Sequence, residues 1–162
     1  MPDPETQPTR SVLFVCTGNT CRSPLAEALC KRRLADRLGV PVDELPTRGF
    51  VIRSAGVMAA AGDPASPEAD EVAREYGADL SAHRSRPVDP ELLAEATDVV
   101  AMTAAHAGLL MLRFPGVGPE PTLLCGEDDL PDPIGCDRAV YRACAEIIVG
   151  QLDRLFGEWL GT

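Results

Sequence analysis

Short apolar runs alternate with longer segments in which apolar residues recur at helical spacing. The apolar runs predict strands at 11–16, 50–56, 96–102 and 120–125. The longer segments predict helices at 24–38, 66–76, 103–113 and 137–160. Strands that alternate with helices are typical of right-handed β-α-β units around a parallel sheet. The pattern therefore predicts a single-domain α/β fold, with helices on both faces of the sheet.

Capping residues mark several of the predicted helix ends. Ser23 stands before a proline as the predicted N-cap of the first helix, with Glu27 in the capping-box position. Gly39 is a plausible stop for the same helix. Ser66, also followed by a proline, predicts the start of the second helix.

The two ends of the chain differ in pattern. Residues 1–10 contain three prolines and few apolar side chains, which predicts a flexible N-terminal tail ahead of a domain at 11–162. The last helix has an apolar stripe at helical spacing, made of Val140, Cys144, Ile147, Ile148, Leu152, Leu155 and Phe156. We find no internal repeat and no sign of a second domain.

Composition and charge exclude several classes of protein. The 162 residues suit one domain with a real core, and no apolar run approaches the roughly 20 residues of a membrane span. The N-terminus has no apolar signal segment, which predicts a cytoplasmic protein with reduced thiols. A net charge of −10 argues against nucleic acid or an anionic membrane as partner, although a local cradle could still bind an anionic substrate. The sequence carries no signal for an oligomeric state.

The first predicted strand runs into "CTGNTCRSP" at residues 16–24. A strand-to-helix turn of a parallel sheet lies at the edge where ligands bind, and its amides and the helix end attract an anion. Gly18 and Asn19 are the residue types that most readily adopt the positive φ of a tight cradle. A nucleotide P-loop would need a lysine here, but the whole chain has only Lys31.

The loop begins with a cysteine, and its neighbours suit a thiolate nucleophile. Loop amides, the helix end and the Arg22 guanidinium would stabilise a Cys16 thiolate beneath a bound anion. Arg22 offers a planar fork to two oxygens of a phosphoryl group. Ser23 could donate a hydrogen bond to the sulfur and assist it as a leaving group.

These motifs together resemble the low-molecular-weight protein phosphatases. The shared segments are "VLFVCTGNTCRSP" (12–24), "RSAG" (53–56), "SAHRSRPV" (81–88), "DVVAMTAAH" (98–106) and "PDPIG" (131–135). They span about residues 11–150 and leave the N-terminal tail and "VPVDELPT" unexplained. The resemblance implies a three-layer α/β/α sandwich around a four-stranded parallel sheet of order 2-1-3-4.

The resemblance also implies a catalytic acid and the rest of the site. Asp132, between two prolines, would protonate the leaving group after Cys16 attacks phosphorus, and then activate water against the phosphocysteine. No metal or other cofactor is implied, and the partners would be phosphorylated proteins. The loop and the pocket would bind substrate and phosphate through Thr17, Gly18, Asn19, Thr20, Cys21, Ser23 and Ile134. Ser54 and His83 would support the loop from behind, whereas Asp128 and Asp129 are expected to be turn residues.

Two positions bear on the phosphorylated residue. Thr20 resembles the bacterial arginine phosphatases, because tyrosine phosphatases of this type usually carry a larger aliphatic residue there. Ile134 departs from both groups, since each usually has an aromatic residue after the Asp-Pro pair. We expect phosphoarginine as substrate, with phosphotyrosine as the alternative.

Other hypotheses fit the sequence less well. An arsenate reductase would need two further cysteines near 98–112, where the chain has none. A structural zinc site on Cys16 and Cys21 lacks a second pair of ligands. A phosphopeptide-binding module would not need both a nucleophile and an acid. A regulatory Cys16–Cys21 disulfide is a further hypothesis, with a packed loop thiol at Cys21 as the alternative.

Several residues are expected to have no site role. They are Cys30, Cys125 and Cys144, as small buried thiols, and His106, as a surface or core residue.

Overall fold

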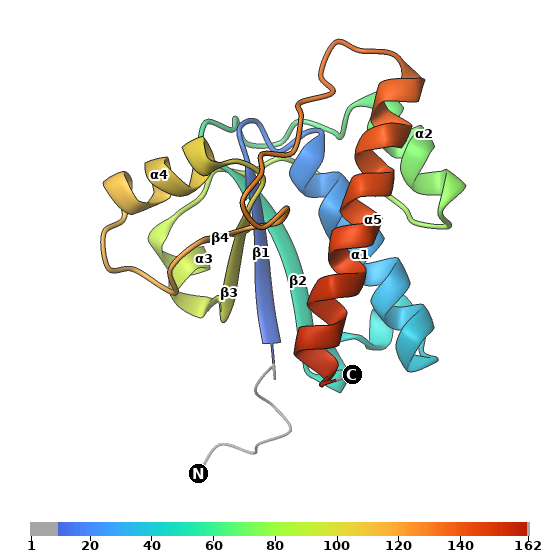
Figure 1. Cartoon of the computed structure of the whole chain (residues 1–162), viewed down its shortest axis with the longest axis horizontal. Helices are drawn as coiled ribbons and strands as arrows, with labels where there is room; N and C mark the ends of the chain where they lie inside the picture. Colours follow the sequence, from blue (N-terminus) through green and yellow to red (C-terminus); the bar gives the residue numbers. More distant parts are fainter. Residues whose placement is uncertain (1–9, 162) are drawn as a thin grey trace.

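β1 (Arg10–Cys16) forms the centre of a four-stranded sheet (Figure 1). The strand order is β2-β1-β3-β4 and all three pairings are parallel, so the predicted order 2-1-3-4 is confirmed. This computed structural model describes residues 10–161. Residues 1–9 of the predicted tail, and residue 162, lie outside the described residues, and Arg10 belongs to β1 rather than to a tail.

The remaining elements follow in the predicted alternation of strands and helices. In chain order they are α1 (Arg22–Leu38), short 3₁₀ turns at Val42–Glu44 and Pro46–Arg48, β2 (Phe50–Gly56), α2 (Pro67–Glu75), α3 (Pro90–Glu95), β3 (Asp98–Ala101), α4 (Ala104–Arg113), β4 (Thr122–Leu123) and α5 (Arg138–Leu160).

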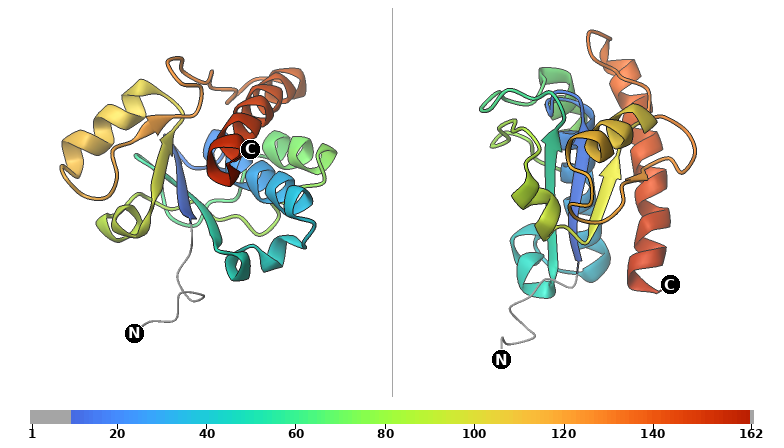
Figure 2. Two further views of the ribbon diagram at one scale, coloured as in Figure 1. Left: turned by 60° about the horizontal axis from the view of Figure 1, so that its bottom comes forward. Right: turned by 90° about the vertical axis from the view of Figure 1, so that its left-hand side faces the viewer.

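The sheet lies between two layers of helices (Figures 1 and 2). Side chains of β1 alternate between the two faces: Val12 and Phe14 pack into the core under α1, α2 and α5, whereas Leu13 and Val15 pack under α3 and α4. Because both faces of the central strand are covered, its residues from 11 to 16 are all buried. The three-layer sandwich is therefore confirmed.

Three differences from the sequence prediction are local. α3 was not predicted, because it has only six residues; it begins at Pro90, and Asp89 caps it by accepting from the Leu92 amide. The third and fourth strands are shorter than predicted, four and two residues long. Gly39 ends α1 with φ of 70°, and Ser66 caps α2, both as predicted.

The predicted apolar stripe of α5 is only partly buried. Cys144, Ile148, Leu152, Leu155 and Phe156 lie in the core. Val140 and Ile147 are each 41% exposed. Ile147 lies beside the buried positions, and in the first turn of the helix Tyr141 is buried instead of Val140.

No helix between residues 10 and 161 is both long enough and apolar enough to cross a membrane. In the same range, no cluster of His, Cys, Asp or Glu side chains is arranged to hold a metal ion.

Candidate active site

The loop from Cys16 to Arg22 connects β1 to α1 and lines a small pocket at the C-terminal edge of the sheet. The pocket has a volume of about 150 Å³. It is lined by Cys16, Thr17, Gly18, Thr20, Cys21, Arg22, Asp132 and Ile134. Two segments that are far apart in the sequence, 16–22 and 132–134, thus meet at one pocket.

α1 begins at Arg22, one residue before the predicted N-cap. Cys21 is the N-cap residue, and within the described part of the chain no side chain caps this end. Ser23 was wrongly predicted as the cap, because its hydroxyl contacts Cys16 and Asn19 instead. Glu27 also does not close a capping box, since its carboxylate binds Ser54. The first-turn amides of α1 are left without a side-chain cap, which suits an anion site.

Asn19 holds the loop from behind. Within residues 10–161 it is the one non-glycine residue with positive φ, at 57°, in line with the expectation. We also expected positive φ at Gly18, and that prediction is wrong. Its Oδ1 accepts from the backbone amide of Arg86 at 3.0 Å, which fixes the orientation of the side-chain amide. Its Nδ2 therefore donates to the hydroxyls of Ser23 (2.8 Å) and Ser54 (2.9 Å).

This arrangement fixes the direction of the remaining hydrogen bonds. Ser54 donates its own hydrogen to Glu27 Oε1 at 2.7 Å. Ser23 accepts from Asn19, so its hydrogen is free for the nearest remaining acceptor. That acceptor is Cys16 Sγ at 2.9 Å, which is closer than the Ala55 carbonyl at 3.5 Å. A Cys16 thiolate can only accept, so in that form the sulfur receives this hydrogen bond from Ser23.

Gly56 at the end of β2 leaves room for the loop backbone, because it has no side chain. A Cβ atom there would lie 2.5 Å from the Thr17 carbonyl oxygen and 3.0 Å from the Asn19 amide nitrogen. The loop backbone therefore packs directly on the glycine.

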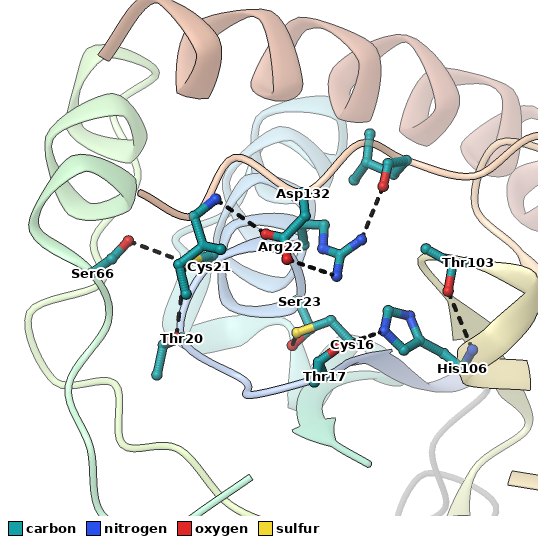
Figure 3. Close-up of polar contacts among 12 residues, drawn as sticks. Cys16, Thr17, Thr20, Cys21, Arg22, Ser23, Ser66, Thr103, His106 and Asp132 are labelled. Atoms are coloured by element: carbon teal, nitrogen blue, oxygen red, sulfur yellow. Dashed lines mark hydrogen bonds and ion pairs between the residues drawn. The ribbon is translucent and has the colours of Figure 1, made fainter. Parts of the chain in front are cut away.

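Arg22 is buried, with its guanidinium between Cys16 and Asp132; we call the loop that carries Asp132, residues 124–137, the acid loop (Figure 3). Its Nη1 donates to the Leu130 carbonyl at 3.0 Å, and its Nη2 lies 3.5 Å from Asp132 Oδ2. The Asp132 side chain is 45% exposed, and its Oδ1 accepts from the Ile134 amide at 3.1 Å. Asp129, predicted as a turn residue, accepts from the Ala104 amide at the start of α4.

Both histidines of the chain contact the loop. His83 Nε2 donates to the Asn19 carbonyl at 2.8 Å, so its ring contacts the backbone of the loop. His106 lies 2.8 Å from Thr17 Oγ1 through its Nε2 and is buried, a contact that sequence reasoning missed. Burial and the nearby Arg22 guanidinium lower the pKa of His106 from 6.5 to about 4. The predicted strand order could have indicated this contact. It sets β3 beside β1, and α4 follows β3 directly, so the start of α4 lies near the loop that follows β1.

The six cysteines are all free thiols. Cys21 Sγ contacts the Tyr141 hydroxyl at 3.3 Å and Ser66 Oγ at 3.5 Å, so the second loop cysteine bonds to α5 and to the start of α2. Cys30 and Cys144 are buried as predicted, and burial raises the pKa of both. Cys125 is only half-buried.

Comparison with known proteins agrees with this geometry. Residues 11–160 match the family described as low molecular weight phosphotyrosine protein phosphatase. A protein-arginine-phosphatase of Geobacillus stearothermophilus is 40% identical over 149 residues, which are 89% of this chain and 92% of the relative. The low molecular weight protein-tyrosine-phosphatase Etp of Escherichia coli is 31% identical over 153 residues, 92% of this chain and 91% of the relative.

Solved structures give the same result. The YwlE arginine phosphatase of G. stearothermophilus superimposes with a TM-score of 0.80 at 36% identity, covering 94% of each chain. A low molecular weight protein tyrosine phosphatase from T. tengcongensis gives 0.81 at 37% identity, covering 93% of this chain and 99% of that one. The chain belongs to the low molecular weight phosphotyrosine protein phosphatase family.

Proposed function

We propose that this protein hydrolyses phosphorylated side chains of proteins through a phosphocysteine, with phosphoarginine as the favoured substrate. One observation carries the proposal: Cys16, whose sulfur lies 2.9 Å from the Ser23 hydroxyl, lines a pocket together with Arg22 and Asp132. A nucleophile, a phosphate-binding cation and an acid therefore surround one small volume. A nucleophilic thiol needs a reducing compartment, so we also propose a cytoplasmic location.

In the first step the Cys16 thiolate attacks phosphorus in line with the leaving atom. An S–P bond forms as the bond from phosphorus to the leaving nitrogen or oxygen breaks. Asp132, half-exposed at the pocket rim, gives its proton to that atom. Arg22 and the loop amides hold the phosphoryl oxygens, with Arg22 turning from Asp132 to the phosphate.

In the second step Asp132 takes a proton from a water molecule, which attacks the phosphocysteine. The S–P bond breaks, inorganic phosphate leaves, and the sulfur regains its negative charge. The Ser23 hydroxyl stabilises that charge, because it lies 2.9 Å from Sγ and a thiolate can only accept a hydrogen bond. A related structure supports this intermediate: a YwlE variant with serine in place of cysteine carries a phosphorylated active-site serine, at a TM-score of 0.81 and 33% identity.

The lining of the pocket supports phosphoarginine. Thr20 and Ile134 face the pocket, and none of its lining residues within the described chain is aromatic. A phenyl ring would find no aromatic wall to pack on, whereas a guanidinium can interact with the Thr20 hydroxyl and the Asp132 carboxylate. Relatives named protein-arginine-phosphatase point the same way.

Phosphotyrosine is the second candidate. Several relatives over most of the chain are named protein-tyrosine-phosphatases. The nucleophile, cation and acid would serve both substrates, so only the pocket wall discriminates between them.

The deciding experiment compares initial rates on one peptide carrying either phosphoarginine or phosphotyrosine, for wild type and Thr20→Ile. We expect faster hydrolysis of phosphoarginine, with a large loss in Thr20→Ile that spares phosphotyrosine. Faster phosphotyrosine turnover that is unchanged by Thr20→Ile would make the protein a tyrosine phosphatase.

Variants of the reacting groups test the chemistry itself. Cys16→Ser and Arg22→Ala should abolish turnover, and Asp132→Ala should slow it by a factor on the order of 10²–10⁴. Full activity in Cys16→Ser would end the proposed mechanism.

A further inference from the structure

The two histidines of this chain contact the phosphate loop on either side of Gly18. His83 bonds to the carbonyl of Asn19, and His106 bonds to the side chain of Thr17. The mechanism above uses neither imidazole. His83 acts on the backbone of the loop, whereas His106 acts on a hydroxyl that lines the pocket, so the two contacts differ in consequence.

His106 is held firmly in its position. It lies in the first turn of α4, where its backbone amide donates to the Thr103 hydroxyl at 3.2 Å. The sheet order sets α4 beside the loop, since β3 pairs with β1. The residue is only 4% exposed, and its ring points at Thr17 (Figure 3).

The surroundings of the ring select one tautomer. Nε2 lies 2.8 Å from Thr17 Oγ1, and Nδ1 is buried without a hydrogen-bond partner among residues 10–161. A buried N–H group without a partner is costlier and rarer than a bare acceptor. The hydrogen therefore belongs on Nε2, which donates to Thr17 Oγ1 and leaves Nδ1 bare.

This tautomer determines what the Thr17 hydroxyl can do. Its oxygen accepts from His106, so its hydrogen is left to donate elsewhere. Thr17 is exposed within the pocket, next to Cys16, and His106 is its side chain's only hydrogen-bond partner in the described part of the chain. The free hydrogen thus faces the space that a bound phosphoryl group would occupy.

We infer that His106 is a positioning residue that turns the Thr17 hydroxyl hydrogen into the pocket, where Thr17 becomes a side-chain donor to the phosphorylated substrate. The inference rests on the proposed function for its catalytic meaning. It adds one donor to the loop amides and Arg22, from the β3 side of the pocket. In the opposite tautomer Thr17 would donate to the ring and offer nothing to substrate.

Burial and nearby charges keep the imidazole of His106 neutral. Burial is the main cause, because it disfavours the charged ring. The Arg22 guanidinium and the positive end of α4 act in the same direction, while Asp132 and Asp129 act in the opposite one. Neutrality matters because a protonated ring would place a second buried cation beside Arg22 and compete for the phosphate.

The first test is the ¹⁵N NMR spectrum of the imidazoles in the free, wild-type protein at pH 7. With two histidines the spectrum is simple, and His83 is an internal reference because its Nε2 faces a carbonyl and must carry hydrogen. We expect His106 to show a protonated Nε2 and a bare Nδ1. A protonated Nδ1, or a charged ring, would overturn the inference. No turnover is needed, so the result stands even if the proposed function fails.

The second test is a double-mutant cycle of His106→Phe and Thr17→Val, measured as kcat/KM on whichever phosphorylated peptide the wild type hydrolyses. Thr17→Val keeps the shape of the side chain, His106→Phe keeps a planar ring, and each change removes one partner of the hydrogen bond. We expect each to lose about 10-fold, and the double variant to lose no more than the larger single loss. Independent losses, near 100-fold in the double variant, would overturn the inference.

Two further variants separate positioning from stability. His106→Gln presents an amide Nε2 near the same place and should recover kcat/KM to within about threefold of wild type; recovery no better than in His106→Phe would count against the bond. Leu110→Ala removes a buried side chain one turn along α4 without touching the imidazole. The loss of kcat/KM in Leu110→Ala should add to the loss in Thr17→Val when the two changes are combined. A combined loss smaller than this would assign the effect of His106→Phe to the packing of α4 and not to the hydrogen bond.

Discussion

The direction of the hydrogen bonds behind Cys16 follows from the orientation of one buried side-chain amide, that of Asn19. The Arg86 amide fixes which end of Asn19 is the donor, and Asn19 in turn makes the Ser23 and Ser54 oxygens acceptors. Ser54 sends its hydrogen to a carboxylate, and Ser23 sends its hydrogen to sulfur. The chain thus holds a donor on the sulfur before any substrate arrives, which costs no reorganisation during reaction.

Ser23→Ala should therefore slow the chemical step, because the Cys16 sulfur loses that donor. We expect kcat to fall by about 10-fold or more, since hydrogen bonds to charged groups contribute about 1.5–3 kcal/mol. Steady-state kinetics on a phosphorylated peptide measure the change. Ser54→Ala is the matched control: it also removes an acceptor of Asn19 Nδ2, but leaves the Ser23–Cys16 contact in place. Equal losses in both variants would assign the effect to Asn19 rather than to the sulfur.

His106 predicts how stability depends on pH. Its pKa is lowered from 6.5 to about 4 in the folded protein, so between these values the unfolded chain binds more protons. The free energy of unfolding should therefore fall as pH drops from about 6.5 to about 4. His106→Gln should remove this contribution and make the slope shallower by at most about 1.4 kcal/mol per pH unit. Urea unfolding at several pH values tests it, and identical slopes in the two proteins would contradict it.

At the scale of elements, what the sequence predicted well is local. The loop "CTGNTCRSP" lies within one strand-turn-helix unit, so its residues and their order are enough to predict an anion cradle. Gly39 and Ser66 act on their own helix ends, and both were predicted correctly. Ser23 has the same local signal as Ser66, but its hydroxyl binds Cys16 and Asn19. A cap prediction fails where tertiary contacts compete for the same hydroxyl.

Residues that act between elements could not be found in this way. Gly56 looks like an ordinary turn glycine, and its role appears only once β2 pairs with β1 and carries the loop against it. His106 similarly looks like a surface or core residue of its helix until β3 is known to lie beside β1. α3 was missed because six residues are too few for a helical period to stand out.

The contact between the end of β2 and the phosphate loop predicts a sharp effect of Gly56→Ala. The new Cβ would lie 2.5 Å from the Thr17 carbonyl oxygen. The position of a Cβ is fixed by its own backbone and the carbonyl is part of the loop backbone, so neither atom can rotate away. The loop must shift, and a displacement of about 1 Å can cost 10²-fold in rate. We expect kcat/KM to fall at least that far. Gly150→Ala in α5 is the control, because a Cβ there meets nothing within 4 Å; it should leave kcat/KM unchanged. Normal turnover in Gly56→Ala would show that the loop tolerates the shift.

At the scale of the whole molecule, a chain of net charge −10 surrounds a site built for an anion. The cation of the pocket is the buried Arg22, and the loop that carries Asp132 also holds Glu127, Asp128 and Asp129. Locally the cradle attracts a phosphoryl group, while at longer range the protein repels negative charge. Phosphorylated peptides should therefore be selected partly by the charge that flanks the modified residue.

This field predicts a dependence on salt with opposite signs for opposite flanking charges. For a phosphopeptide flanked by lysines, kcat/KM should be highest at low salt and fall several-fold as the screening length shrinks from about 30 Å at 0.01 M to about 10 Å at 0.1 M. For the same peptide flanked by glutamates it should rise over that range. Glu127→Gln/Asp128→Asn removes two charges of the acid loop and leaves Asp129 and Asp132 in place, so both slopes should become flatter. If kcat/KM depended equally on salt for peptides with lysine, glutamate and neutral flanks, association would depend only on the phosphate loop and Arg22, and not on the charge of the surrounding surface.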